Sequence, residues 1–437
     1  MLFSMFITAC GNGNNSASNN PPATENTGTN NNQPAAEEPA KEPEKVTLRV
    51  FSTFGGTDAA RDAFQAVIDE FTASHPNVTI ENDTMSANDD GFRTKVNTDM
   101  TSGNEPDLLF YFIGADAEGF VNAGKVVPLN EVLDANADWK NGFIPDALEL
   151  ARQKDGNIYA APLTGFYEGL FVNKKIFEDN GLELPTDWTK LTTAVKALAA
   201  KDIIPLSVPF DQSHYLIEHT ILSAAGPEGQ NKGLGDAIDP NWEKAYAAMK
   251  ELYDLGAFPK DAATIDLNMT GNYYSEGLAA MTLEGSWAIG GWSDDTRANT
   301  TVIPFPTVPG GAGSGNDIVG GFGSGFYLSK ATYDDAAKKD TAVELLKHLT
   351  SPNSIKTIAS ANGGTPAADV EVTGLQQVQL DGFAMAAKAA SISAPVDSKV
   401  SPETFSDLRA SVQQVVTGKK TPTEAIDSAK KVEDANK

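Results

Sequence analysis

The sequence predicts an α/β fold, because segments with strand character alternate along the chain with segments of helical periodicity. Val46–Phe51 alternates in the manner of a strand, and the apolar residues of 64–71 then recur at the three- and four-residue spacing of an amphipathic helix. Residues 107–112, DLLFYF, form a continuous apolar run, as expected for a strand that is covered on both faces. These three observations indicate a sheet packed between helices.

The remaining elements continue the alternation. The sequence HPN at 75–77 ends the first predicted helix, and 78–80 forms a second short strand. Pro106 and Gly114 bound the apolar strand between them. Further helices are predicted at 191–200, 242–255 and 341–349. No internal repeat is visible in the sequence.

The N-terminal region contains Cys10, the only cysteine among the 437 residues. The apolar residues before it resemble the lipobox of bacterial lipoproteins, in which the cysteine becomes the lipid-carrying N-terminus. A signal peptide needs a basic segment, and no Lys or Arg precedes Cys10. Residues 1–10 are therefore interpreted as a truncated or incomplete lipoprotein signal with Cys10 as the lipidation site. The alternative is a chance cysteine in a disordered tail.

Residues 11–45 are predicted to form a disordered tether. The segment consists almost wholly of Asn, Gly, Ser, Thr, Pro, Glu and Ala, and the next Val, Ile, Leu or aromatic residue is Val46. Such a segment buries too little apolar surface to offset the entropy lost on ordering. A thiol at its outer end would have no base, oxyanion donor or pocket, so catalysis by Cys10 is not expected.

The composition is strongly acidic. Lys and Arg number 33 against 59 Asp and Glu, which gives a formal net charge of −26. Such a surface repels phosphate backbones and anionic lipid headgroups, so we expect no nucleic-acid partner and membrane contact only through the lipid anchor. A single cysteine excludes intrachain disulfides and thiolate metal sites. No apolar run beyond the N-terminus approaches the roughly 20 residues of a membrane span.

Several stretches resemble the extracellular solute-binding proteins that serve ABC importers, in particular the carbohydrate-binding type (family 1). The two most specific are DGNIYAAPLTGFYEGLFVNKKIFEDNGLELPTDWTKL at 155–191 and GLAAMTLEGSWAIGGW at 277–292. Three further stretches are PDLLFYFIGADAEGFVNAGKVVPL, ELLKHLTSPNSIKTIASANGGTPA and VVTGKKTPTEAID. The similarity covers the chain after Val46, in the order that the family shows.

The resemblance implies a two-lobed, periplasmic-binding-protein-like fold of type II, with a ligand cleft between lobes that close by hinge bending. Crossings between the lobes are expected near 164–168, 319–323 and 365–370. The N-lobe would comprise 46–165 and 322–366, and the C-lobe 166–321 and 367–437. Glycines at 320, 321, 323 and 325 would supply backbone freedom at a hinge.

The candidate ligand-binding residues follow from this resemblance and from the chemistry of sugars. A pyranose has hydroxyl groups around its edge and a C–H face that packs on aromatic rings, so its site needs aromatics beside carboxylates and amides. The candidates are Trp287, Gly285, Phe54, Gly56, Thr57, Tyr111, Phe112, Asp116, Tyr167, Glu168, Asp211, Gln212, His214 and Asn362.

The roles of these candidates differ. Trp287 is expected to stack on the sugar, unless it belongs to the core, and Gly285 would let the backbone approach the ligand. Strand alternation requires that one of Tyr111 and Phe112 face the core. For Asp211, Gln212 and His214 the alternative is an exposed loop, and for Phe54–Thr57 a helix-capping loop.

The predicted function is capture of a sugar or oligosaccharide and its delivery to the permease subunits of an ABC transporter. The resemblance implies a monomer on the extracellular face of the membrane of a Gram-positive cell, with no cofactor and no metal. Neither a nucleophile-elbow nor a phosphate-loop motif occurs, so a separate ATPase would drive transport. One alternative is a binding protein for a non-sugar solute such as a polyamine, peptide or metal chelate. Another is a secreted glycoside-active enzyme, for which no acid/base pair is recognisable.

Overall fold

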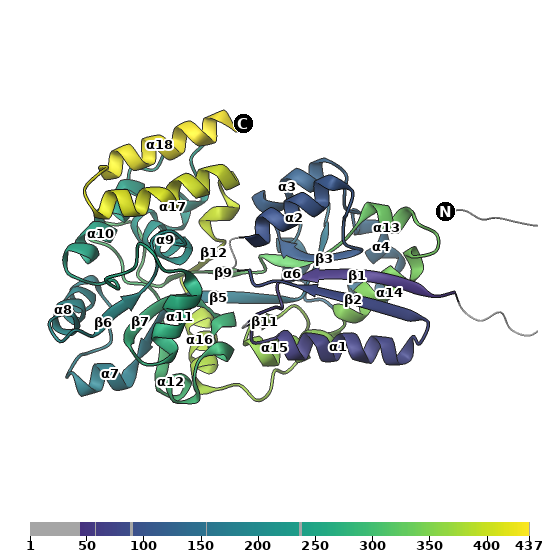
Figure 1. Ribbon diagram of the computed structural model, residues 1–437, viewed down its shortest axis with the longest axis horizontal. Coiled ribbons are helices and arrows are strands. Elements are labelled where there is room, and N and C mark those ends of the chain that lie inside the picture. The colour runs from purple at the N-terminus through teal and green to yellow at the C-terminus, as the bar shows by residue number, and fades with distance from the viewer. Residues whose placement is uncertain (1–43, 57, 88–90, 154, 236–237, 437) are drawn as a thin grey trace, which may run out of the picture. The chain divides into compact units, whose positions relative to one another are not determined.

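The structure is a computed structural model that describes residues 44–436 except 57, 88–90, 154, 236 and 237. The described residues form two β-sheets, each with helices on its faces (Figure 1). The α/β fold and the two-lobed arrangement expected from the sequence are confirmed. Cys10, the proposed signal at 1–10, nearly all of the tether and Thr57 lie outside the described residues.

The first sheet has five strands among the described residues, in the order β2-β1-β3-β10-β4. β1 is parallel to β2 and β3, whereas β10 is antiparallel to β3 and β4. The strands are β1 (Val46–Ser52), β2 (Val78–Thr84), β3 (Leu108–Phe112), β4 (Ala160–Pro162) and β10 (Ser324–Leu328). The strands predicted at 46–51, 78–80 and 107–112 are thus confirmed.

Helices from two distant parts of the chain cover this sheet, and together with it they form what we call the first lobe. Phe64, Val67, Ile68 and Phe71 are buried on one face of α1, as their spacing predicted. The helices are α1 (Arg61–Ser74), α2 (Gly91–Ser102), α3 (Ala115–Asn122), α4 (Asn130–Ala135), α5 (Ala137–Lys140), α6 (Pro145–Leu150), α13 (Lys330–Asp334), α14 (Lys339–Leu349) and α15 (Pro352–Asn362).

The second sheet has seven strands among the described residues. Its order is β12-β9-β5-β7-β6, and β8 and β11 also pair with β5. β5 is long because it serves both lobes. The strands are β5 (Thr164–Asn173), β6 (Ile204–Ser207), β7 (Ala279–Gly285), β8 (Thr300–Ile303), β9 (Asp317–Gly321), β11 (Thr365–Pro366) and β12 (Ser391–Ser393).

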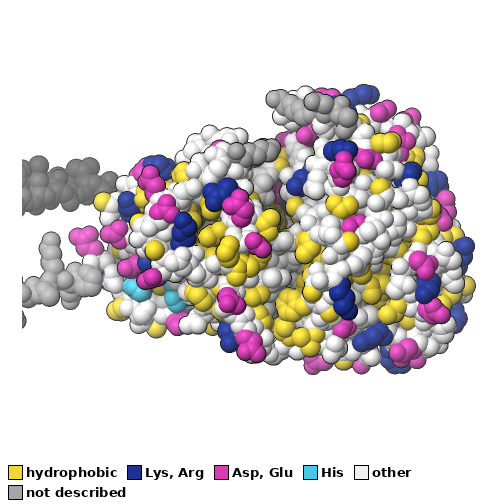
Figure 2. Space-filling view, turned by 180° about the vertical axis from the view of Figure 1, so that it is seen from behind, with side chains coloured by type: hydrophobic (Ala, Val, Ile, Leu, Met, Phe, Trp, Pro, Cys, Tyr) yellow, Lys and Arg dark blue, Asp and Glu magenta, His cyan; other side chains and the backbone are white. Residues whose placement is uncertain are grey.

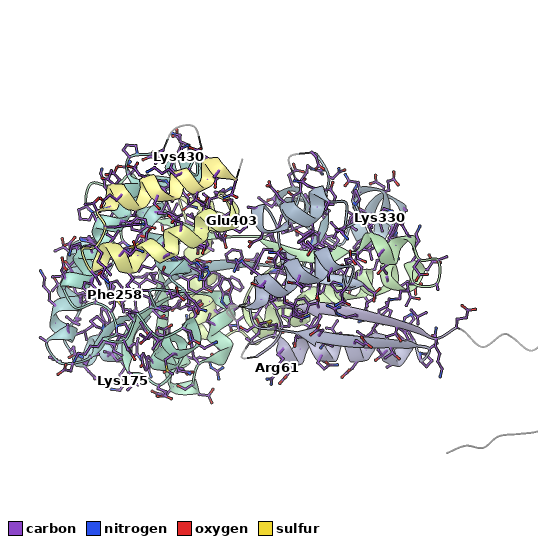
Figure 3. All side chains as sticks on the ribbon, turned by 45° about the horizontal axis from the view of Figure 1, so that its top comes forward. Arg61, Lys175, Phe258, Lys330, Glu403 and Lys430 are labelled. Carbon is purple, nitrogen blue, oxygen red and sulfur yellow. The ribbon has the colours of Figure 1, made fainter. Side chains whose placement is uncertain are left out.

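The helices around this sheet complete the second lobe. They are α7 (Lys174–Asp179), α8 (Trp188–Ala199), α9 (His214–Asn231), α10 (Trp242–Asp254), α11 (Leu267–Ser275), α12 (Asp294–Asn299), α16 (Gln377–Lys388), α17 (Pro402–Val416) and α18 (Pro422–Ala435), with 3₁₀ helices η1 (Ser286–Gly291) and η2 (Val396–Ser398). The helices predicted at 191–200, 242–255 and 341–349 are α8, α10 and α14. Figure 3 labels residues of both lobes: Arg61 and Lys330 in the first, and Lys175, Phe258, Glu403 and Lys430 in the second.

Helix ends are set by local side chains. Asp187 caps α8 by accepting a hydrogen bond from the backbone N–H of Lys190 at 2.8 Å. α15 begins with Ser351 as its cap and Pro352 in its first turn, and it ends where Gly363 adopts φ = +68°. Because Gly363 turns the chain, Asn362 lies at the end of this helix, where its Oδ1 accepts from the N–H of Gly364 at 2.8 Å.

The chain changes sheets at three places. β5 begins beside β11 and continues through β9 into pairing with β7 and β8. The chain returns between β9 and β10, where Gly321 adopts φ = +121°. After β11, the buried Ala367 and Ala368 still pack in the core of the first lobe, so the chain remains there past 366.

Gly320 and Gly325, on either side of the second crossing, have a packing role that was not predicted from the sequence. A Cβ atom on Gly320 would lie 2.7 Å from the carbonyl oxygen of Phe166, and one on Gly325 would lie 2.7 Å from that of Ala161. Both glycines therefore allow close contact between paired strands.

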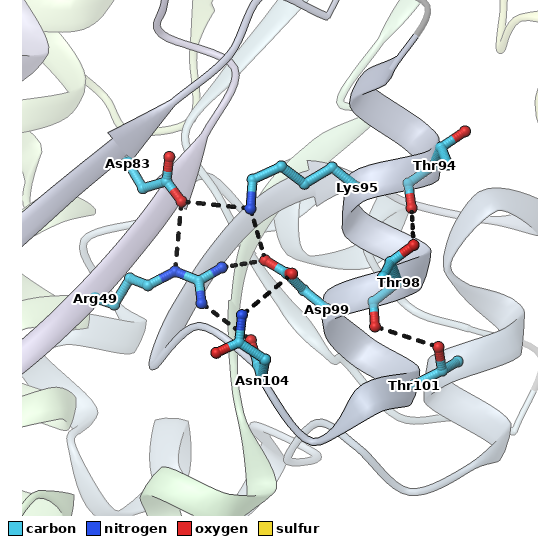
Figure 4. Close-up of polar contacts among 8 residues, drawn as sticks. All are labelled: Arg49, Asp83, Thr94, Lys95, Thr98, Asp99, Thr101 and Asn104. Carbon is cyan, nitrogen blue, oxygen red and sulfur yellow. Dashed lines mark hydrogen bonds and ion pairs between the residues drawn. The ribbon is translucent and has the colours of Figure 1, made fainter.

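A polar network ties α2 to β1 and β2 of the first sheet (Figure 4). The Arg49 guanidinium pairs with Asp83 at 3.5 Å and with Asp99, and it also donates to the carbonyl of Asn104 at 3.0 Å. Lys95 on α2 pairs with Asp99 at 3.0 Å and with Asp83 at 3.6 Å. This network fixes the position of α2, and the Arg93 side chain extends from this helix into the cleft between the lobes.

Candidate functional site

A cavity of about 580 Å³ lies between the two lobes. Its wall combines aromatic rings with carboxylates and amides, and both lobes contribute. The residues of the first lobe that matter here are Phe54, Asp58, Arg93, Phe112, Asp116 and Asn362. Those of the second lobe are Phe166, Glu168, His214, Tyr215, Glu218, Glu284, Trp287 and Asp397. A size of this order suits a small solute.

Three aromatic rings of the second lobe form one part of the wall. Trp287 follows β7 in η1 and is half-buried; its ring lies 5.4 Å from that of Phe166 and 6.0 Å from that of Tyr215, measured between centroids. The indole N–H interacts with the Glu284 carboxyl and the Tyr215 hydroxyl. Polar contacts on one edge of the ring therefore orient its face.

Gly285 has a different role from the one predicted. A Cβ at this position would lie 2.3 Å from Cη2 of Trp287, and Gly285 itself does not line the cavity. The missing side chain therefore makes room for the Trp287 ring, and the predicted close approach of a ligand to this backbone is wrong.

The wall of the first lobe is organised around Arg93. Its guanidinium lies 4.6 Å from the centre of the Phe112 ring and pairs with Asp116 through Nε at 3.0 Å. Nη2 reaches across the cleft to Asp397 on η2, also at 3.0 Å. Burial alone would lower the pKa of Arg93, but the carboxylates of Asp116 and Asp397 raise it, so the guanidinium remains charged. This ion pair joins the two lobes.

Three carboxyl groups are buried in the wall of the second lobe. Glu168, Glu218 and Glu284 have exposed fractions of 2%, 2% and 5%. Burial raises the pKa of Glu284 to about 8, against the Gly285 N–H and the Trp287 N–H, which lower it. Burial together with the neighbouring Glu218 charge raises the pKa of Glu168 well above its ordinary value. The Glu168 and Glu218 carboxyls are in hydrogen-bonding contact, so one of them holds a proton.

Two histidines stand behind these carboxyls on α9. Nδ1 of His219 lies 3.9 Å from Oε2 of Glu168 and 2.8 Å from the carbonyl oxygen of Tyr215. Burial lowers the pKa of His219 to about 4. Burial and the nearby guanidiniums of Arg409 and Arg93 lower the pKa of His214 well below its ordinary value. Both imidazoles are therefore neutral near pH 7 and do not balance the carboxyls.

Seven of the predicted ligand-binding residues lie on the cavity wall: Trp287, Phe54, Phe112, Asp116, Glu168, His214 and Asn362. Their role in binding remains a prediction. The structure groups them around the aromatic rings of both lobes.

Two predicted tyrosines belong to the core instead. Tyr111 is 1% exposed and packs beside Phe92 and Phe120, because alternation along β3 directs Phe112 to the cavity. Tyr167 is 1% exposed and lies against Phe383, while its neighbours Phe166 and Glu168 line the cavity. Both assignments as ligand-binding residues are corrected.

Three other predicted residues also lie away from the cavity wall. Gly56 and Asp211 are exposed on loops. Gln212 is buried, and its Oε1 accepts a hydrogen bond from the N–H of Leu267 at 2.8 Å, which fixes the start of α11. Gln212 is therefore a structural residue.

Several wall residues were missed. Phe166 could have been found, because it lies in the expected crossing 164–168 two residues before the candidate Glu168, and Glu284 lies within a family-like stretch beside Trp287. Arg93 and Asp397 had no such signal, since 304 positions separate them along the chain. Glu218 and Tyr215 lie on α9, which is buried on nearly all sides and shows no polar face.

Two kinds of feature are absent from the described residues. Among the described residues, no group of three His, Cys, Asp or Glu is arranged to hold a metal ion. No helix in the described part of the chain is both long and apolar enough to cross a membrane.

Residues 57–356 match the family model described as bacterial extracellular solute-binding protein. An uncharacterized ABC transporter extracellular-binding protein of Pyrococcus horikoshii is 26% identical over 283 residues, 61% of this chain and 63% of that protein. A multiple sugar-binding protein of Streptococcus mutans is 24% identical over 293 residues, 64% of this chain and 66% of that protein. The chain therefore spans slightly less than two thirds of the length of these two curated relatives.

The fold has a close counterpart among solved structures. A chitin oligosaccharide binding protein superimposes with a TM-score of 0.80 and 24% sequence identity, over 90% of this chain and 98% of the other. This likeness concerns the fold. Since the family model matches more than half of the chain, the chain belongs to the bacterial extracellular solute-binding proteins.

Proposed function

We propose that this protein captures a sugar or oligosaccharide in the cleft between its lobes and delivers it to the permease of an ABC transporter. Family membership supports extracellular solute capture. The sugar assignment is supported by a multiple sugar-binding protein among the relatives and a chitin oligosaccharide binding protein among the similar folds.

The observation that carries the proposal is the half-buried Trp287 on the wall of a cavity of about 580 Å³. A sugar ring can place its C–H face on this indole while its hydroxyls reach the carboxyls of Glu168 and Glu284. The first lobe would supply Asp116 and Asn362 from the opposite side. Contacts from both lobes would favour the closed arrangement when solute is bound.

A thermal-shift screen of mono- and oligosaccharides tests the proposal. A ligand at 100 times its dissociation constant stabilises the folded protein by about 2.7 kcal/mol, so a bound sugar should raise the melting temperature. Titration calorimetry should then give one site per chain. If no sugar in a broad panel shifts the melting temperature while a peptide or a metal chelate does, the solute is not a sugar.

The same purified protein distinguishes capture from cleavage. We expect an oligosaccharide ligand to be recovered intact after prolonged incubation, because the proposed role is stoichiometric binding. Growth of shorter products with time, followed by chromatography, would support the glycoside-active alternative.

We also propose that Cys10 carries a lipid that holds a monomer on the outer face of the cell membrane of a Gram-positive bacterium. The apolar residues before Cys10 and the polar segment after it support this anchoring. With a full signal peptide placed before it, Cys10→Ser should release the protein into the medium. Unchanged retention in the membrane fraction would contradict the anchor.

A further inference from the structure

The cavity wall carries more negative than positive side chains. Seven of its described residues are Asp or Glu, whereas only Arg93, Arg152 and Lys399 are Arg or Lys. Figure 2 shows one face of the molecule, on which Lys and Arg are interspersed with Asp and Glu. The excess of acid is therefore a property of the cleft as well as of the composition.

The ion pairs that the described residues form within the cleft do not reach Glu168, Glu218 or Glu284. Arg93 pairs with Asp116 and Asp397, and Arg152 pairs with Glu149 at 2.9 Å outside this group. Among the described residues, no Lys or Arg forms an ion pair with Glu168, Glu218 or Glu284. Nδ1 of His219 lies 3.9 Å from Oε2 of Glu168, but it belongs to a neutral imidazole.

The carboxyls themselves are incompletely satisfied. Beyond the contact between Glu168 and Glu218, the buried Oε2 atom of each has no hydrogen-bond partner among the described residues. Both residues are 2% exposed and line the cavity. Buried acceptors without donors are costly, so they indicate a ligand group that supplies donors.

Aromatic rings adjoin these oxygens. Glu168 pairs across the sheet with Gly285, over which the Trp287 ring lies, and Phe166 is two residues away on the same strand. The Tyr215 phenol is close enough to Glu168, Glu218 and Glu284 for all three carboxyls to affect its pKa. Aromatic faces beside carboxylates form an environment that attracts a cation.

We propose that the solute carries a protonated amine, which binds to Glu168 and Glu218 beside the Trp287, Phe166 and Tyr215 rings. The inference rests on the proposed sugar capture and names its substrate class: a sugar or oligosaccharide with a free amino group. An ammonium group offers three donors and a positive charge, whereas a hydroxyl at the same position offers one donor and no charge. The ammonium group thus supplies donors to both unpartnered oxygens, and its positive charge favours loss of the proton that Glu168 and Glu218 share.

Calorimetric titration at pH 7 with matched sugars tests this inference without altering the protein. The probes are glucosamine, galactosamine and mannosamine with glucose, galactose and mannose as hydroxyl partners, and the β-1,4 disaccharide of glucosamine with cellobiose and N,N′-diacetylchitobiose. We expect at least one amine to bind tenfold or more tighter than each of its uncharged counterparts in this panel. Equal or tighter binding of the uncharged partners would overturn the amine assignment and leave sugar capture in place.

Single substitutions then test whether the amine binds at Glu168 and Glu218. Glu168→Gln and Glu218→Gln should reduce the preference for amine over hydroxyl to near one, whereas Glu276→Gln, an exposed site at the end of α11, should keep it. An unchanged preference in both cleft variants would overturn the assignment to this pair. If a charge-neutral variant fails to fold, the wild-type comparison of matched sugars still decides.

Spermidine, a protonated amine without a sugar ring, separates the two proposals. If it binds in the cleft while no sugar does, the proposed sugar capture fails and the amine site stands. If no amine of any kind binds, the inference fails.

Discussion

The two walls of the cleft hold carboxylates in different ways. In the first lobe, Asp116 lies beside the guanidinium of Arg93, which also holds Asp397 from the opposite side at 3.0 Å. In the second lobe, Glu168, Glu218 and Glu284 have no Lys or Arg partner among the described residues, and burial raises their pKa values. Asp116 and Asp397 thus share one cationic partner, whereas Glu168 and Glu218 each keep a buried oxygen without a donor among the described residues.

This difference indicates which side of the cleft recognises the solute. A carboxylate paired with Arg93 contributes mainly to the link between the lobes, because the guanidinium already offsets part of its charge. Unpaired acceptors beside aromatic rings gain most from a bound ligand. We therefore expect the second lobe to dominate affinity and the first lobe to contribute closure.

The largest effect should follow from Trp287→Ala. Loss of the stacking surface should weaken sugar binding at least tenfold, which corresponds to about 1.4 kcal/mol. Tyr253→Ala, an exposed aromatic on α10 away from the cleft, is the matched control. Calorimetry beside a denaturant melt separates the two possible roles. Undiminished affinity in a folded but destabilised variant would place Trp287 in the core.

Gly285→Ala should displace the Trp287 ring. Its Cβ would meet Cη2 of Trp287 at 2.3 Å, so the indole must shift and affinity should fall several-fold, though less than in Trp287→Ala. Gly119→Ala, with open space around its Cβ in α3, is the control. Full affinity with an unshifted tryptophan fluorescence spectrum would show that the ring is not supported in this way.

Arg93→Met tests the ion pairs that join the two walls. It leaves Asp116 and Asp397 without their partner, and a guanidinium that is 29% exposed should account for about 1 kcal/mol of the free energy of unfolding. A urea melt measures the loss, with Arg61→Met as the control, since that side chain is 57% exposed. A variant as stable as the wild type would mean that the ion pair between the lobes contributes little.

The stability of the ligand-free protein should depend on pH through the second wall. The pKa of Glu284 is about 8 in the folded protein against an ordinary value of 4.5, so its protonated form favours folding. This contribution is complete below about pH 4.5 and is lost as the pH rises through about 8.

Melting temperatures between pH 6.5 and pH 9 check this prediction. The fall with rising pH should be shallower in Glu284→Gln, because the neutral amide has no proton to lose, and should persist in the exposed-site control Glu276→Gln. Identical slopes in the wild type and Glu284→Gln would contradict the raised pKa.

The smallest expected effect concerns lobe closure. A bound sugar that contacts both walls should reduce the radius of gyration in solution scattering, since the three chain crossings allow the lobes to approach. The measurement compares the protein with and without a saturating sugar found in the thermal-shift screen. Superimposable scattering curves would argue for recognition by the second wall alone.

Much of the fold was determined by short-range pattern in the sequence. Alternation and helical periodicity are local properties, so β1, α1 and β3 were predicted within a few residues of their observed ends. Trp287 and Glu168 were predicted from stretches that resemble the family, and Phe112 from its place at the end of a predicted strand; their role in binding stays a prediction. Alternation also implied that only one of Tyr111 and Phe112 could face the cleft, but not which one.

Only the tertiary structure decided which distant residues meet. Arg93 and Asp397 form an ion pair across 304 positions, and Glu218 meets Glu168 because α9 packs against the sheet that contains β5. Gly285 was assigned to the ligand from its sequence neighbourhood, yet the Trp287 ring occupies the space above it. Periodicity specifies which face of an element is buried, whereas charge pairing and ring contacts depend on how whole elements pack, and that information is not local to any stretch of the chain.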